Sequence, residues 1–494
     1  MRDHVQLIAY ADRLAGDLRG LRQALTGPLD GVFDAVHVLP FYDPIDGSDA
    51  GFDPIDHTRV DPRLGTWDDL EALSRDVPVM ADLIVNHVSS SSPEFADVLD
   101  RGDDSPHAGM FLTLGAVFPD GAREDDLARL YRPRPGLPFT PYLDADRRRR
   151  LYWTTFTSEQ IDLDVSHPAA LAYLDRVLDT FAAHGVGMVR LDAVGYAVKT
   201  PGTSSFMTPE TFAFIRDLAA RAHARDIEVL VEVHAYWRRQ VEIAAEVDWV
   251  YDFALPPLVL HALYTGETGP LQRWCEVRPT NAVTVLDTHD GIGVIDVGPD
   301  QADVAHLGLL DADGIDRLVE GIHASSGGTS RLATGAAASN VDLYQVNCTF
   351  HDAVGGDDDA HLLARAIQVF LPGVPQIYYV GLLGEGNDLE LLHTTGAGRD
   401  INRHRFDVDE LTAALQRPFT RALLQLLRFR RAHPAFAGTF ALHDAPEGQL
   451  ACAWTDGTHR AALHVDLDTR TTTVTATTDR GEVTLTDLTA LPVG

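Results

Sequence analysis

The stretch GMVRLDAVGY, residues 187–196, decides the fold of this chain. Its first half is a short apolar run that is typical of a buried strand, and Asp192 follows where the run ends. Arg190 stands two residues earlier, so alternation along a strand puts both side chains on one face. Charged groups at the carboxyl end of a buried strand are typical of parallel barrels, whose sites are built there.

Seven further apolar runs have the same character, and helix-like stretches separate them. They are residues 5–10, 35–39, 79–85, 227–231, 249–251, 282–286 and 376–380. Eight strands that alternate with helices predict an α/β fold in which a parallel (β/α)8 barrel is the core.

The gaps between these strands are uneven, which predicts two inserted loop domains. Four short alternating strands near the end, residues 449–455, 461–467, 471–477 and 482–488, predict a small C-terminal all-β domain. We therefore divide the chain into a barrel (1–86, 167–290 and 356–435), a first insert (87–166), a second insert (291–355) and a C-terminal domain (436–494).

Charge and composition exclude several kinds of partner. A net charge of −33 argues against nucleic acid or an anionic membrane. The apolar runs are too short to span a bilayer, and the first residues do not resemble a signal peptide, so we expect a cytoplasmic protein. The three cysteines do not have the spacing of metal ligands.

Three carboxylates follow three of the predicted strands: Asp192, Glu232 in EVLVEVH, and Asp290 in VLDTHD. A parallel barrel brings such strand ends to one pocket. Glycoside chemistry with retention needs two carboxyl groups about 5–5.5 Å apart, one as nucleophile and one as acid/base. Because like charges raise one pKa, we expect Glu232 to be protonated, while Arg190 keeps Asp192 ionised.

Four short motifs together resemble the α-amylase superfamily: DLIVNH (82–87), VRLDAV (189–194), EVH around Glu232, and LDTHD (286–290). The segment FDPIDHT (52–58) matches it as well. Longer stretches narrow the resemblance to the sucrose phosphorylase family, among them YRPRPGLPFT (131–140), RLDAVGYAVK (190–199) and ATGAAASNVDLYQVN (333–347).

The resemblance implies a role for each matching residue. Asp192 would be the nucleophile, Glu232 the acid/base and Asp290 the transition-state stabiliser. The bound glucosyl ring would contact Asp49, Phe52, His87, Phe156, Arg190, His289 and Arg399. The acceptor subsite, which the second insert helps to form, would contain Tyr131, Arg134, Tyr196, His234, Asp342, Tyr344 and Gln345.

Within that subsite, Arg134 can form paired hydrogen bonds with phosphate oxygens, whereas Asp342 would accept from sugar hydroxyls. The resemblance therefore suggests a loop that exchanges Asp342 for Tyr344 and Arg134 between two half-reactions. The chain departs from its relatives at Val341, where they often have Leu. Many amylases have Lys-His where Gly195-Tyr196 stands here, so we expect no calcium, no other metal and no cofactor.

The expected reaction converts sucrose and inorganic phosphate to glucose 1-phosphate and fructose. Phosphorylases of sucrose 6′-phosphate, glucosylglycerol or glucosylglycerate share this chemistry and stay open as alternatives, as does a sucrose hydrolase. A non-catalytic sugar-binding scaffold is disfavoured because all three carboxylates are present. The sequence leaves a homodimer open.

Overall fold

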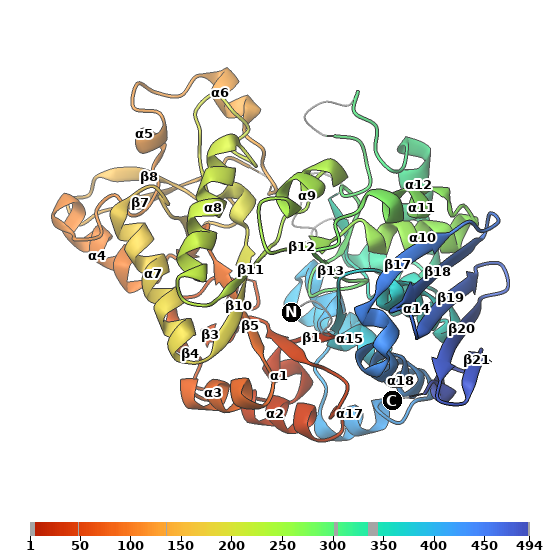
Figure 1. Ribbon diagram of the computed structural model, residues 1–494. Coiled ribbons are helices and arrows are strands. Elements are labelled where there is room, and N and C mark those ends of the chain that lie inside the picture. Colours follow the sequence, from red (N-terminus) through yellow and green to blue (C-terminus); the bar gives the residue numbers. More distant parts are fainter. Residues whose placement is uncertain (1–4, 48, 135, 301–304, 334–343, 493–494) are drawn as a thin grey trace.

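Eight parallel strands close into a barrel in the computed structural model, which describes residues 5–47, 49–134, 136–300, 305–333 and 344–492 (Figure 1). Each strand pairs with the preceding and following strand of the barrel in chain order. The strands are β1 (Gln6–Ala9), β2 (Ala35–Val38), β5 (Val79–Ile84), β10 (Val186–Asp192), β11 (Glu228–Val231), β12 (Trp249–Asp252), β13 (Ala282–Thr284) and β16 (Val374–Tyr378). All eight predicted runs coincide with these strands to within two residues, so the predicted barrel is confirmed.

The strands are almost continuously buried because helices cover the outside of the barrel. These helices include α2 (Leu18–Thr26), α3 (Trp67–Asp76), α7 (Pro168–Ala183), α8 (Pro209–His223), α10 (Leu255–Thr265), α14 (Asp358–Phe370) and α18 (Pro418–Ala432). Helix α7 shows why the sequence folds in this way. His167 caps its first turn, and residues at helical spacing, from Tyr173 to Phe181, form its buried face.

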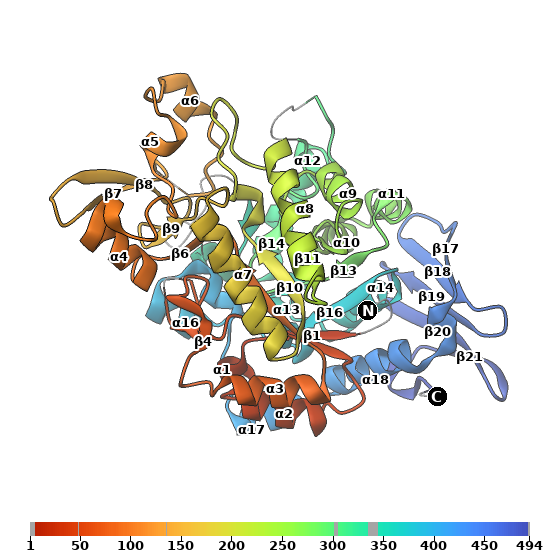
Figure 2. The ribbon, with the colours of Figure 1, turned by 60° about the vertical axis from the view of Figure 1, so that its left-hand side comes forward.

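The first insert leaves the barrel after β5 and returns before α7. It contains β6 (His87–Ser89), α4 (Pro93–Arg101), α5 (Leu114–Val117), α6 (Glu124–Arg129), β7 (Phe139–Leu143), β8 (Arg149–Trp153) and β9 (Gln160–Asp162). Strands β6 and β9 pair antiparallel, with His87 opposite Asp162 (Figure 2). This pairing holds both ends of the insert next to the mouth of the barrel.

Lys199, the only lysine of the chain, joins the insert to the barrel. Its side chain is 2% exposed, and its Nζ lies 2.6 Å from Asp162 Oδ2. The same ammonium donates to Asn86 Oδ1 at 2.8 Å and to the carbonyl oxygen of Tyr196. One cation therefore links the end of β5, the end of the insert and the segment after β10.

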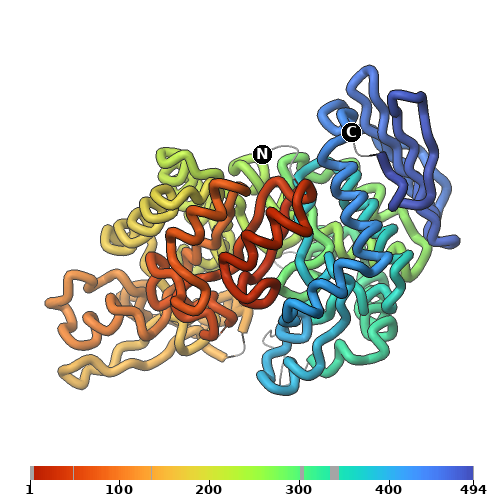
Figure 3. Tube along the Cα trace, turned by 90° about the horizontal axis from the view of Figure 1, so that it is seen from below, coloured from red at the N-terminus to blue at the C-terminus, as the bar shows by residue number. Residues whose placement is uncertain are grey.

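The second insert and the C-terminal sheet come later in the chain than the first insert. Strands β14 (Ile292–Gly293) and β15 (Gln345–Val346) pair with each other, and α12 (Ala312–Ser325) lies between them in sequence. The C-terminal sheet is antiparallel, in the order β17 (Thr439–His443), β18 (Gln449–Thr455), β19 (Arg460–Asp466), β20 (Thr471–Thr478) and β21 (Gly481–Leu485). It lies at the opposite end of the molecule from the first insert (Figures 1 and 3).

The predicted C-terminal β domain is thus present, with one strand more than the four read from the sequence. Strand β17 was missed because its residues alternate between half-buried and exposed, which gives a weak apolar signal. Among the described helices, none has both the length and the apolar character that crossing a membrane would require.

Replacing Lys199 tests the link between insert and barrel. Lys199→Met removes the ammonium and leaves Asp162 buried without its cation, which costs about 3–5 kcal/mol in typical proteins. We expect a marked fall in the midpoint of thermal unfolding. Arg19→Met is the control, because it removes an exposed ion pair with Asp69 and should change the midpoint little. Equal effects of both substitutions would contradict the role of Lys199.

Candidate active site

One cavity gathers most of the residues that the sequence predicts for the site. The predicted residues that line it are Asp49, Phe52, His87, Arg134, Phe156, Asp192, Tyr196, Glu232, His234, His289, Asp290, Tyr344, Gln345 and Arg399. Tyr131 is not in the lining and instead stacks on Tyr196, with ring centroids 6.0 Å apart. Asp342 lies outside the described residues.

Arg190 lies behind the cavity wall and is 2% exposed. Its Nη1 donates to Asp192 Oδ1 at 2.7 Å and to Asp82 Oδ1 at 2.6 Å. Arg190 and Asp82 are opposite each other in the β5–β10 register, so the sheet itself brings them together. His37 on β2 contacts the second oxygen of Asp82, with Nε2 at 2.9 Å from Oδ2. The nucleophile candidate is therefore held by a chain of hydrogen-bonded side chains that crosses three strands.

Burial raises the pKa of Asp192 to about 8, although the charge of Arg190 opposes the rise. The nearby carboxylates of Glu232, Asp82 and Asp290 add to it. The sequence analysis expected the raised pKa on Glu232, whereas the structure raises that of Asp192. The reason is that Asp192 is buried among three other acids, and one guanidinium is shared between them.

Glu232 follows β11 and lies across the cavity from Asp290. Its Oε2 accepts from the backbone N–H of Ala193 at 3.3 Å, and its Oε1 lies 3.9 Å from Arg190 Nη2. Ala193 has a φ of 54°, a left-handed conformation that is rare for a residue with a side chain. The strained turn at Ala193, immediately after Asp192, directs its backbone N–H at Glu232. Strained backbone of this kind is typical of functional sites.

Asp290 and Asp49 share a pair of arginines. Arg399 Nη1 lies 2.9 Å from Asp290 Oδ1 and 3.2 Å from Asp49 Oδ2. Arg403, which the sequence analysis missed, lies 3.3 Å from Asp49 and donates to the carbonyl oxygen of His289. Burial alone would raise the pKa of both carboxyl groups, but these arginines lower the pKa of Asp49 and hold that of Asp290 well below its usual range. Both are therefore anionic.

The apolar wall of the cavity comes from aromatic rings. Phe52 stacks on His289 with centroids 4.8 Å apart and an angle of 7° between the rings, and Phe156 packs against His87 at 5.3 Å. Burial lowers the pKa of His289 to about 3 and also lowers that of His87. Both rings are therefore neutral near pH 7, and His87 can donate from Nε2 to the carbonyl oxygen of Phe52.

The remaining lining residues form the other side of the cavity. The guanidinium of Arg134 lies 5.8 Å from the centre of the Phe156 ring. The ring of His234 stacks on Phe253 at 3.7 Å, and Gln345 Nε2 lies 3.0 Å from His234 Nε2. Pro133, Gln160 and Phe206 also line the cavity, although the sequence analysis did not assign them to the site.

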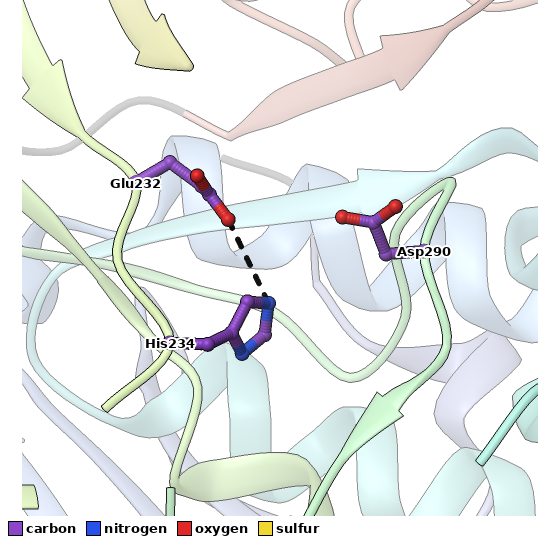
Figure 4. Close-up of side chains that lie close together, drawn as sticks. All are labelled: Glu232, His234 and Asp290. Atoms are coloured by element: carbon purple, nitrogen blue, oxygen red, sulfur yellow. Dashed lines mark ion pairs between the residues drawn. The ribbon is translucent and has the colours of Figure 1, made fainter. Parts of the chain in front are cut away.

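Glu232, His234 and Asp290 each offer one possible ligand atom within 4.8 Å of the others (Figure 4). His234 Nε2 is 3.8 Å from Glu232 Oε1, the pair that the figure marks. All three side chains face the cavity, and each has its own protein partner: Ala193 for Glu232, Asp296 for His234 and Arg399 for Asp290. We interpret them as groups that face a substrate.

A parallel barrel whose strand ends carry three buried carboxylates and a guanidinium defines a carbohydrate-active enzyme of the α-amylase type. The family model "Alpha amylase, catalytic domain" matches residues 7–250. A sucrose phosphorylase of Agrobacterium vitis is 56% identical over 96% of this chain and 97% of its own length, and one of Bifidobacterium adolescentis is 53% identical over 94% and 92%. The chain belongs to the sucrose phosphorylase family.

A solved relative agrees with this placement. The crystal structure of a sucrose 6F-phosphate phosphorylase from Thermoanaerobacter thermosaccharolyticum has a TM-score of 0.90 and 36% identity, over 98% of both chains. The similarity therefore extends through both inserts and the C-terminal sheet.

Asp82 offers a test of the charge chain, because it does not line the cavity. Asp82→Asn removes one of the carboxylates that raise the pKa of Asp192, and it also frees Arg190 to pair more closely with Asp192. The pKa of Asp192 should fall, and the limb of the pH–rate profile that reports it should move to lower pH. A fall in turnover of about 10–100-fold is expected for the loss of a residue that orients a reacting group.

Asp252→Asn is the matched control for this variant. Asp252 is also fully buried on a barrel strand and binds an arginine, Arg278, at 2.7 Å, but it does not line the cavity or contact Arg190. It should lower stability without moving the pH–rate limb. An unmoved limb in a folded Asp82→Asn protein would contradict the coupling.

Proposed function

We propose that this chain transfers the glucosyl unit of sucrose to inorganic phosphate and releases fructose and α-glucose 1-phosphate. The observation that carries the proposal is the cavity itself, in which Asp192 and Glu232 lie together with a half-buried cation, Arg134. A neutral leaving sugar does not need that cation, whereas a phosphate acceptor does. The names of the relatives that are more than 50% identical support the same reaction.

In the first half-reaction, a carboxylate oxygen of Asp192 attacks the anomeric carbon of the glucosyl unit. Glu232 gives a proton to the glycosidic oxygen, and fructose departs. Two adjacent carboxyl groups with one proton between them suit this step. The attack needs Asp192 in its ionised form, and the hydrogen bond from Arg190 supports that form against the burial that raises the pKa of Asp192.

In the second half-reaction, a phosphate oxygen attacks the glucosyl ester on Asp192. Glu232 takes the proton from that oxygen and so regains the proton that it gave to fructose. The anionic Asp290 stabilises the positive charge that develops on the sugar in both steps. Asp49, His87 and Arg399 would hold the hydroxyls of the glucosyl ring, and Phe52 and Phe156 would contact its apolar face. This double displacement retains the anomeric configuration and requires no cofactor.

We propose the domain division that the sequence suggested, with the second insert, residues 291–355, supplying acceptor-side groups. The support for this role of the second insert is that Tyr344, just before β15, and Gln345, the first residue of β15, both line the cavity. An exchange of Asp342 for Tyr344, a cytoplasmic location and a homodimer all stay predictions.

The direct test is to incubate the purified protein with sucrose and phosphate and to assay glucose 1-phosphate, with Asp192→Asn as the inactive control. Free glucose in place of glucose 1-phosphate, with or without phosphate, would make the protein a hydrolase. Activity that appears only with sucrose 6′-phosphate, glucosylglycerol or glucosylglycerate would assign it to one of those phosphorylases instead.

Glu232→Gln separates protonation of the leaving group from the rest of catalysis. Cleavage of sucrose should fall by at least about 10³-fold, because fructose can no longer be protonated. α-Glucosyl fluoride has a leaving group that needs no proton, so formation of the ester should be largely spared, and azide should restore turnover. Glu228→Gln, at the opposite end of the same strand, is the control and should leave both donors unaffected. Equal losses on both donors would contradict the acid/base role.

Arg134→Ala tests the phosphate contact. A charge-assisted contact made in the second half-reaction is worth about 2–3 kcal/mol, so the phosphate concentration for half-saturation should rise and hydrolysis should gain over phosphorolysis. Ester formation should change much less. Arg132→Ala, in the same loop, removes a hydrogen bond to the carbonyl oxygen of Gly136 and controls for bracing of the loop. An unchanged product ratio in the folded Arg134 variant would remove this residue from the site.

A further inference from the structure

A buried carboxylate, Asp296, lies directly behind His234 and outside the cavity lining. Asp296 Oδ2 is 2.8 Å from His234 Nδ1. Its other oxygen, Oδ1, accepts from the backbone N–H of Ala235 at 3.2 Å and from Gln240 Nε2 at 2.9 Å. Asp296 is 0% exposed, so three donors that point at it hold one carboxylate in a fixed orientation.

This arrangement decides which nitrogen of His234 carries a proton. A carboxylate can only accept, so Nδ1 must be protonated in order to donate to Asp296. Nε2 is then the nitrogen that faces the cavity, where it lies 3.8 Å from Glu232 Oε1. A carboxylate in this position also favours the doubly protonated, cationic ring.

Gln345 can serve the ring in both charge states. Its Nε2 lies 3.0 Å from His234 Nε2, which suits a neutral ring that accepts. Its Oε1 is buried and has no hydrogen-bond partner among the described residues. When the amide is turned over, that oxygen can accept from the Nε2–H of a cationic ring.

The backbone leaves space for the Asp296–His234 pair at Gly293. A Cβ on Gly293 of β14 would lie 2.2 Å from Asp296 Oδ2 and 3.2 Å from His234 Nδ1. Glycine is therefore required where the second insert passes the pair. The arrangement is built from three segments, since Asp296 follows β14, His234 follows β11 and Gln240 lies in α9 (Trp237–Ala244).

We propose that Asp296 is a positioning residue which holds His234 as a cation with its Nε2 edge facing the acceptor, so that the ring supports an anionic acceptor more than a neutral one. This proposal rests on the proposed function, because the anionic acceptor is phosphate. In the first half-reaction the group at this position is neutral fructose. In the second it is an anion that has to enter beside the carboxylates of Glu232 and Asp290, where a second cation besides Arg134 offsets their repulsion.

The charges that face His234 agree with a cationic ring. Burial, the largest single effect, lowers the pKa of His234. The Asp296 carboxylate and its hydrogen bond, together with the charges of Glu232 and Asp290, raise the pKa by more. The net pKa of His234 lies above its usual value. The neutral rings of Phe253, stacked at 3.7 Å, and Tyr344, at 5.3 Å, complete its surroundings.

Asp296→Asn keeps the shape of the side chain and removes its charge. We expect the phosphate concentration for half-saturation to rise about tenfold and the share of hydrolysis to increase. Ester formation from α-glucosyl fluoride should change less than about threefold. Removing the Asp296 charge should lower the pKa of His234. The cationic ring is lost as pH rises through that pKa, so the loss of phosphate affinity with rising pH should begin at a lower pH in the variant than in the wild type.

Two further variants make the result decisive. If Asp296 acts through His234, then Asp296→Asn added to His234→Ala should cause no further change in phosphate half-saturation. Gln240→Met keeps the charge of Asp296 but removes one of its hydrogen bonds, so it should shift half-saturation in the same direction by less. It also serves if Asp296→Asn does not fold, as judged by thermal unfolding beside the Asp252→Asn control.

An unchanged half-saturation in folded Asp296→Asn and Gln240→Met proteins, or equal losses in both half-reactions, would overturn the proposal. So would additive effects of Asp296→Asn and His234→Ala. Failure of the proposed function gives a different result, since the wild-type protein would then produce no glucose 1-phosphate from sucrose and phosphate at all.

Discussion

The guanidinium of Arg190 is the interaction on which the site depends. It is a buried cation among Asp82, Asp192 and Glu232, and without it the barrel would enclose uncompensated anions. Its position follows from the barrel, because Arg190 and Asp82 are paired in neighbouring strands, and Asp192 lies two residues further on the same face. The strand register therefore fixes the distance from Asp192 to its counter-charge, and a shift by one residue would point Arg190 out of the barrel.

The other buried acids also have fixed partners. Asp290 and Asp49 share Arg399, Asp296 holds His234, and Asp162 holds Lys199. Each pair joins segments that are far apart in the sequence, so the charges that would destabilise a dry cavity also fasten the inserts to the barrel. Burial and partners differ from one acid to the next. The pKa of Asp192 is raised while that of Asp290 is lowered, although both line one cavity.

The barrel and the positions of its three carboxylates were predictable from the sequence. Each barrel strand is a short apolar run, and Asp192, Glu232 and Asp290 each follow one of these runs. What escaped prediction depends on pairs between distant segments. Arg403 and Asp49 are 354 positions apart in the sequence, and Asp296 and His234 are 62 positions apart. No motif in the sequence indicates that either pair is in contact. The raised pKa of Asp192 also escaped prediction. Like charges predict that the pKa of one acid of a pair is raised, but which acid this is depends on burial, which the sequence does not give.

The groups that we propose for the acceptor differ in charge from those that we propose for the reacting centre, which bears on why phosphate rather than water should complete the reaction. The proposed mechanism places the carboxyl groups of Asp192 and Asp290 around the reacting carbon, where they suit an oxocarbenium-like transition state but disfavour an incoming anion. In that arrangement phosphate can approach only if cations line its path, and we propose Arg134 and His234, which both line the cavity, for this role. Water needs no such compensation. Preference for phosphate therefore has to be built into the acceptor side, at a distance from the carboxylates that the barrel supplies.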